Sequence, residues 1–168
     1  MFFKFKKLKG LTLTELLVVI GIVAFLSTMA IANYKDKGAK ANVDAQAQKF
    51  ASVLKQAQIM ALTGEKVSGV RPFGYGIFIN LDDYYYLFAD LNGDNIRTAA
   101  DADIQRFAFP TSVTNNSHTT YIIFYPPKAK IYVNPAGGAA DTKTITFSYK
   151  NKIKNVVIRI STGRIDTQ

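Results

Sequence analysis

The chain has 168 residues, of which 48% are apolar, enough for one folded domain with a core and an appended segment. It has no cysteine, which excludes a disulfide framework, a thiolate metal site and a cysteine nucleophile. The formal net charge of +9 would suit a nucleic-acid-binding protein, but the basic residues gather in the first ten residues and the last third, while 82–103 is acidic.

The chain begins with a basic segment followed by an apolar run. Four lysines and no acid precede Gly10: Lys4, Lys6, Lys7 and Lys9. From Leu11 to Ala32 there are about 22 residues, which would cross a bilayer core of roughly 30 Å. The lysines predict that the leader stays in the cytoplasm and that everything after Asn33 lies outside.

Glu15 is the one charged residue of the apolar run, and a carboxylate there is costly without a cationic partner. No basic residue lies within one helical turn, so we expect its partner to come from elsewhere. A plain membrane anchor would explain the length of the run but not the acid. A secretory signal peptide is a further alternative, because the small residues 30–32 before Asn33 are typical of its cleavage site. It also leaves Glu15 unexplained.

The residues around Gly10 resemble the prepilin signature of type IV pilins and type II secretion pseudopilins, in which a basic leader ends in glycine before an apolar helix that carries an acid. The matching run is Lys9-Gly10-Leu11-Thr12-Leu13-Thr14-Glu15-Leu16-Leu17-Val18-Val19-Ile20. The resemblance implies cleavage after Gly10 by a prepilin peptidase and methylation of the new amino group on Leu11. It also implies that Glu15 pairs with the amino terminus of a neighbouring subunit, which is how a buried carboxylate becomes tolerable. Leu11 stands where the family usually has phenylalanine, but cleavage is still expected because the leader-side feature is the glycine.

Beyond the apolar run the helix is expected to continue as an amphipathic segment. Apolar residues recur at spacings of four and three, at Val43, Ala47, Phe50, Leu54, Ala57 and Ala61. Gly64 follows and is the expected C-cap. We expect the stripe to pack against a sheet. A coiled coil with a partner is the alternative, although the alanines would make its seam thin.

From Gly74 the pattern changes to short strands separated by turn residues. The predicted strands are Tyr75–Ile79, Tyr84–Ala89, Ile104–Phe109, Tyr121–Tyr125, Lys130–Val133, Thr144–Tyr149 and Asn155–Ile160. Hairpin turns are expected at 81–83 and 150–152, and loops at 126–127 and 134–138.

The predicted fold class is therefore α+β: a long N-terminal helix, transmembrane in its first half, packed on a mostly antiparallel and pilin-like β domain. The predicted parts are a prepilin leader (1–10), a transmembrane and filament-core helix (11–34), an amphipathic continuation (35–64) and an exported β-rich domain (65–168). The runs Gly74–Phe78, Tyr86–Asp90 and Thr162–Ile165 resemble the GspH/FimT group of minor pilins and pseudopilins. That resemblance implies a minor subunit that helps to initiate or decorate a filament.

A loop in the acidic stretch has oxygen ligands at the first, third, fifth and twelfth positions: Asp90, Asn92, Asp94 and Asp101, with the backbone carbonyl of Ile96 as a further candidate. This spacing resembles calcium loops of the EF-hand or dockerin kind. Asn95 stands where those loops have glycine, and Asp101 is shorter than the usual bidentate glutamate. The alternative is a loop whose Asx side chains cap its own backbone.

Catalytic patterns are lacking. His118 is the only histidine, and neither a nucleophile elbow nor a phosphate-binding glycine loop is present. We therefore expect no enzyme. The alternative function is that of a DNA-binding minor pilin in a DNA-uptake pilus, because some FimT-like minor pilins take up DNA through a basic C-terminal region. The candidate phosphate contacts are Lys150, Lys152, Lys154, Arg159 and Arg164. An acid, Asp166, follows where that group would have a second arginine.

The sequence thus predicts a minor pilin or pseudopilin of a type IV pilus or a type II secretion pseudopilus. Its expected partners are other pilins, the prepilin peptidase, an inner-membrane assembly platform and the membrane, with nucleic acid as the less favoured partner. The expected location is the inner membrane in a single pass, with the globular domain outside the cytoplasm, followed by the filament. Calcium is the only cofactor that the sequence suggests.

Overall fold

The computed structural model describes residues 12–80, 84–110, 113–116, 119–134 and 141–168, with the side chains of 30–36 left aside. The predicted cleavage and methylation positions, Gly10 and Leu11, and the predicted turn at 81–83 lie outside the described residues. The chain divides into two compact units, Met1–Gly38 and Ala39–Gln168. Helix α1 (Leu13–Thr63) contributes its first part to unit 1 and its second part to unit 2.

The first part of α1 is apolar on every side. Its large side chains from Leu13 to Met29 are all at least 50% exposed. Hydroxyl groups interrupt the apolar surface only at Thr14, Ser27 and Thr28, and the last two donate hydrogen bonds to carbonyls of their own helix. Among the described residues, none of the large apolar side chains between Leu13 and Met29 is buried.

One part of the predicted fold class is wrong. Among the described residues, no helix combines the length and the apolar character needed to cross a membrane. This finding contradicts the predicted transmembrane first half and the predicted single-pass inner-membrane location, and neither is used below.

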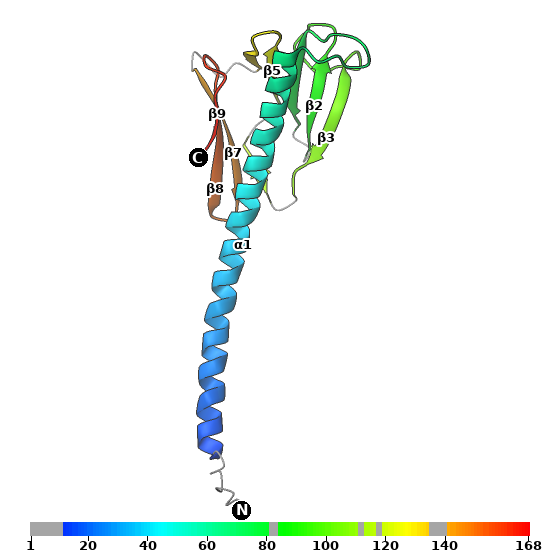
Figure 1. Cartoon of the computed structure of the whole chain (residues 1–168). Helices are drawn as coiled ribbons and strands as arrows, with labels where there is room; N and C mark the ends of the chain where they lie inside the picture. Colours follow the sequence, from blue (N-terminus) through cyan, green and yellow to red (C-terminus); the bar gives the residue numbers. More distant parts are fainter. Residues whose placement is uncertain (1–11, 81–83, 111–112, 117–118, 135–140) are drawn as a thin grey trace, which may run out of the picture. The chain divides into compact units, whose positions relative to one another are not determined.

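Unit 2 is α+β with antiparallel sheets. A five-stranded sheet has the order β3-β2-β1-β5-β6, and a four-stranded sheet has the order β4-β7-β8-β9. The strands are β1 (Gly74–Ile79), β2 (Tyr84–Asp90), β3 (Ala102–Ala108), β4 (Thr114–Asn115), β5 (Thr120–Tyr125), β6 (Lys130–Asn134), β7 (Thr142–Tyr149), β8 (Lys152–Arg159) and β9 (Ile165–Thr167). In Figure 1 the two sheets lie on either side of the last turns of α1.

The core of unit 2 forms where α1 meets both sheets. Phe50 on α1 contacts Tyr85 of β2 edge-on, with ring centroids 5.2 Å apart, and Phe147 of β7 at 5.4 Å. Every member of the predicted stripe is at most 1% exposed, so its expected packing against a sheet is confirmed. Gly64 follows the last helical residue with φ +61°, which confirms it as the C-cap because a left-handed backbone favours glycine.

The five-stranded sheet also buries side chains on its other face. Phe88 of β2 and Ile123 of β5 are fully buried, although Leu87 and Ile122 beside them point into the main core. Between them lies Gly76 of β1, paired in register with both. A Cβ at Gly76 would lie 2.6 Å from the Phe88 ring and 2.9 Å from the Ile123 side chain. The strand therefore needs glycine there to let the two side chains meet over it.

The loop from Leu91 to Asp101 provides the cover for this second core. The Tyr125 hydroxyl of β5 donates a hydrogen bond to Asn95 of the loop. Gly93 has φ +78°, and its missing Cβ would lie 3.3 Å from the Phe73 ring. Contacts from β5 and from the segment before β1 thus hold the loop against the outer face of the sheet.

Candidate functional site

Helix α1 begins with a reciprocal pair of hydrogen bonds. The Thr12 backbone N–H donates to Oε2 of Glu15 at 3.0 Å, and the Glu15 backbone N–H donates to Oγ1 of Thr12 at 3.3 Å. The Thr12 hydroxyl also donates to Oε2 of Glu15 at 3.0 Å. This arrangement is a capping box, which satisfies two amide groups that a helix start leaves without intrahelical partners.

The capping box gives Glu15 a local role that the sequence analysis missed. The signal was present, because Thr-x-x-Glu before an apolar run is the sequence pattern of such a cap. All three hydrogen bonds use Thr12 and leave Oε1 without a hydrogen bond from the described residues. A single carboxylate can therefore cap its own helix and still accept a donor from another chain.

The acidic loop after β2 is built on its own main chain. Asp90 is fully buried, and its two oxygens accept hydrogen bonds from the N–H of Gly93 at 2.6 Å and of Asn95 at 3.2 Å. Asn92 accepts from the N–H of Asp94 at 3.1 Å. Glycine at 93 and asparagine at 95 are both left-handed, with φ +78° and +66°, so the residue types suit the turn.

Asp101 closes the same loop from its far end. Its Oδ1 accepts the Leu91 N–H at 3.0 Å, and its Oδ2 accepts the Thr98 N–H at 2.7 Å and the Thr98 hydroxyl at 3.0 Å. The pKa of Asp90 is raised above its ordinary value mainly by burial. Hydrogen bonds from Gly93 and Asn95 lower it in part, and the carboxylates of Asp101 and Asp94 raise it further.

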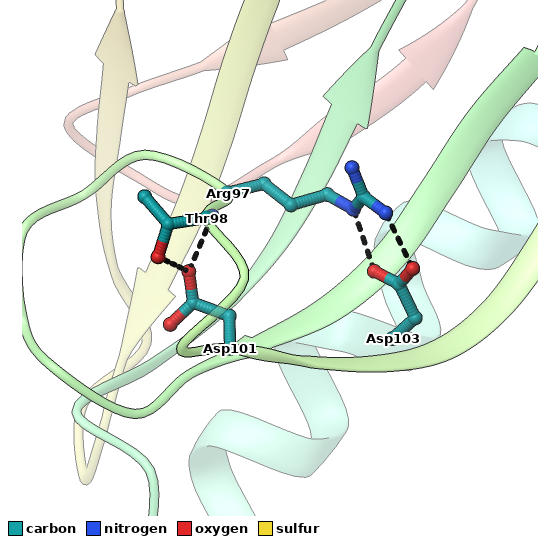
Figure 2. Close-up of polar contacts among 4 residues, drawn as sticks. All are labelled: Arg97, Thr98, Asp101 and Asp103. Atoms are coloured by element: carbon teal, nitrogen blue, oxygen red, sulfur yellow. Dashed lines mark hydrogen bonds and ion pairs between the residues drawn. The ribbon is translucent and has the colours of Figure 1, made fainter.

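Arg97 of the loop forms a bidentate ion pair with Asp103 of the five-stranded sheet. Figure 2 shows its guanidinium facing the carboxylate of Asp103 at the start of β3, with Nε 2.6 Å from Oδ1 and a second bond from Nη2 to Oδ2. The guanidinium also lies 4.2 Å from the Tyr86 ring centroid and 5.8 Å from that of Phe78. The hydrogen bond to Asp103 is the main cause of the raised pKa of Arg97.

The predicted calcium ligands are thus occupied by the loop itself. The side-chain oxygens of Asp90, Asn92, Asp94 and Asp101 accept hydrogen bonds from loop N–H groups. Within the described ranges, no three acidic, histidine or cysteine side chains are arranged to hold a metal. The arrangement favours the alternative of a self-capped Asx loop. Calcium, with Ile96 as carbonyl ligand, stays a prediction and carries no step below.

The predicted nucleic-acid contacts do not form one surface. Lys152 and Lys154 alternate with buried Val156 and Ile158 on β8, so they share the inner face, whereas Arg159 lies on the opposite face. Several of the five already have partners within the chain. The Lys154 ammonium lies 3.7 Å from Asp44 on α1, Arg164 donates to Asp166 at 2.9 Å, and the Lys150 ammonium lies 5.4 Å from the Tyr149 ring centroid.

Comparison with known proteins gives no further guide to the site: no family model, curated protein or solved structure matches the chain. Two features of the chain therefore indicate its function, the capped start of α1 with Glu15 and the exposed apolar side chains that follow.

Proposed function

We propose that this chain is a structural subunit of a filament, a minor pilin or pseudopilin of a type IV pilus or a type II secretion pseudopilus. It would be processed after Gly10 and assemble through the first part of α1. The resemblance around Gly10 to the prepilin signature suggests the family. The exposed apolar surface of the helix is the physical reason to expect assembly.

The observation that carries the proposal is the apolar helix surface that unit 1 leaves uncovered. Eleven large apolar side chains are half exposed or more: Leu13, Leu16, Leu17, Val18, Val19, Ile20, Ile22, Val23, Phe25, Leu26 and Met29. Burying one such side chain contributes about 1.5–3 kcal/mol. Because they surround the helix, one partner on one side would leave the rest exposed. A helix that is apolar on all sides belongs in the interior of an assembly, here a bundle of α1 helices from several copies.

Glu15 would set the axial register of that bundle. In a dry interior a carboxylate is stable only when it is paired, and removing one partner of such a pair typically costs about 3–5 kcal/mol. Oε1 accepts no hydrogen bond from the described residues, which leaves room for a cationic donor from a neighbouring subunit. The resemblance names that donor as the amino terminus created at Leu11. A helix that slides along its neighbour would lose the pair, so only one register satisfies both groups.

The deciding experiment measures the intact mass and N-terminal sequence of the full chain, produced with and without an active prepilin peptidase. A chain that begins at methylated Leu11 only when the peptidase is present supports the proposal. A chain that begins at Asn33 irrespective of the peptidase would identify the first segment as a secretory signal peptide. A chain that keeps its leader under both conditions would also overturn the proposal.

A further inference from the structure

A surface pocket of about 360 Å³ lies where α1 ends in unit 2. Its lining residues come from the end of the helix, the segment before β1 and the β5–β6 turn: Leu62, Thr63, Gly64, Arg71, Pro72, Phe73, Pro126 and Pro127. Pro72 is buried and forms an apolar floor, whereas Leu62 and Phe73 stand beside it at 53% and 61% exposure. The pocket is therefore apolar in its body and open to solvent.

The exposed apolar residues of unit 2 gather in the same stretch of chain. Among its described residues, four large apolar side chains between 59 and 73 are more than half exposed: Ile59, Leu62, Val70 and Phe73. The others, Ile96, Tyr132 and Ile153, lie in separate elements. Ile59 and Val70 do not line the pocket, but Leu62 and Phe73 do, and exposed apolar side chains at one concave site indicate a surface that a partner covers.

One charged side chain lines this pocket, and it is a cation. Arg71 makes no ion pair within the described part of the chain, unlike Arg97 and Arg164, which pair with aspartates. Its guanidinium lies against the helix end, since the missing Cβ of Gly64 would be 3.0 Å from one of its nitrogens. The last turn of α1 has no basic residue, so Arg71 also faces the partially negative helix terminus.

Arg71 is exposed and makes no ion pair within the described residues, so its guanidinium donors stay available to a partner. A guanidinium has five N–H donors, and their fork matches the two oxygens of a carboxylate. Lys66 and Lys128 flank the lining residues in the sequence and are both exposed. Glu65 is the acid nearest in sequence, and it lines a different groove with Ile59 and Ile104. The balance of charge at the pocket is therefore positive.

We propose that this pocket is a docking site for a segment of another protein that presents large apolar side chains next to a carboxylate. The apolar side chains would fill the space between Leu62, Phe73 and the prolines, and a carboxylate would accept a bidentate pair of hydrogen bonds from Arg71. Aromatic and arginine residues in a desolvated pocket are the usual centres of binding energy at protein interfaces. The site lies in unit 2 and goes beyond filament assembly through the first part of α1.

The test uses the full-length chain and a fluorescein-labelled peptide of eight residues that alternates glutamate with phenylalanine and leucine. Fluorescence anisotropy measures its dissociation constant beside those of three control peptides. In the first, glutamine replaces glutamate; in the second, serine replaces the apolar residues; in the third, lysine replaces glutamate. We expect the acidic apolar peptide to bind at least tenfold more tightly than each control.

Variants locate the site. Arg71→Gln and Phe73→Ser should each weaken binding at least tenfold, and Arg71→Lys should weaken it by a smaller factor because the charge stays while the fork is lost. Arg106→Gln is the matched control, an exposed arginine on β3 that stacks on Tyr84 and makes no ion pair within the described residues. It should leave binding unchanged. An equal loss in Arg106→Gln, equal binding of the serine peptide, or no binding of any peptide at millimolar concentration would overturn the proposal. Circular dichroism of each variant checks that the fold is kept.

Discussion

Thr12 and Glu15 satisfy each other at the start of α1, each accepting the backbone N–H of the other. The Glu15 carboxylate thus caps its own helix. In the proposed filament it would also form an ion pair with a neighbouring subunit. The two roles separate by substitution. Glu15→Gln keeps an oxygen that can accept the Thr12 N–H but removes the charge. We expect normal helix content by circular dichroism and at least a tenfold loss of filament yield by sedimentation.

The companion variant is Thr12→Ala, which removes the cap but keeps the charge of Glu15. Loss of an N-cap side chain costs about 0.5–2 kcal/mol, so the helix start should fray while filaments still form. Filaments that form in Glu15→Gln and fail in Thr12→Ala would show that capping alone explains the acid.

Gly76 is predicted to tolerate no side chain. An alanine Cβ would press on Phe88 at 2.6 Å and on Ile123 at 2.9 Å, and both are fully buried, so neither has room to turn away. Overpacking of this kind costs on the order of 1–3 kcal/mol, which urea unfolding of the full chain would detect. Gly38→Ala is the control, because nothing lies within 4 Å of its added Cβ and a helical alanine gains about 0.5–1 kcal/mol over glycine. Equal stability of Gly76→Ala and wild type would mean that the second core can rearrange freely.

Arg97→Lys should weaken the hold of the loop on the sheet. Lysine keeps the charge but loses the fork that meets Asp103 and the planar group that covers Tyr86. The pair is partly exposed, at 28% for Arg97 and 44% for Asp103, so we expect a loss of only about 1 kcal/mol. Arg164→Lys, whose side chain is 68% exposed, should cost less than about 0.5 kcal/mol. The reverse order would show that the Arg97 contacts do not hold the loop.

The pH dependence of stability should differ in sign between two aspartates. Burial raises the folded-state pKa of Asp90 above the unfolded value, so its ionised form disfavours the fold and its contribution improves as the pH falls from 7 towards 4. Hydrogen bonds from Ser161 lower the pKa of Asp141, so its contribution is present at pH 7 and is lost as the pH falls below about 4. Urea unfolding of wild type, Asp90→Asn and Asp141→Asn from pH 3 to pH 7 measures how each substitution changes the free energy of unfolding at each pH. Parallel curves for both variants would contradict the assignment.

The calcium prediction for the Asp90–Asp101 loop implies that calcium raises the unfolding temperature of the wild-type chain over that in a chelator, since a ligand bound only by the folded state stabilises it. Asp94→Asn should remove that rise, because it deletes one predicted ligand charge. Its Oδ1 acceptor for the Ile96 N–H is kept, so the loop should still fold. An unfolding temperature indifferent to calcium in both proteins would leave the loop as a self-capped turn.

The sequence predicted those features of unit 2 that depend on local periodicity. The stripe from Val43 to Ala61 and the C-cap at Gly64 follow from helical spacing and backbone preference, and both are confirmed. The two shortest strands were missed. β4 has two residues and β9 three, and β9 is held by pairing with β8 and by reciprocal backbone bonds between Asn155 and Gln168. Such pairing is set by tertiary contact and leaves no periodic signal.

The second core and the grouping of basic residues were harder to predict than the helix for a related reason. Gly76, Phe88 and Ile123 are far apart in sequence, and only the register of three strands brings them together under one loop. Alternation on β8 separated basic residues that lie close in the chain, such as Lys154 and Arg159. The Thr12–Glu15 cap has a recognisable sequence pattern. It was missed because Glu15 was interpreted only as a carboxylate that needs a cationic partner. The transmembrane prediction rested on a count of apolar residues in the sequence, and among the described residues no helix is long and apolar enough to support it.

The cover that the Leu91–Asp101 loop gives to Phe88 and Ile123 decides where a tag can be placed. Judged by length alone, this loop is the natural place to insert an epitope or a fluorophore-binding sequence. An insertion there would expose the buried side chains of Phe88 and Ile123. The sheet would then carry an exposed apolar surface that favours unwanted association. Both residues of the turn at Lys150 and Asn151 are exposed, and Lys150 already has a left-handed backbone, with φ +54°. Labels used to follow this protein in cells belong at that turn.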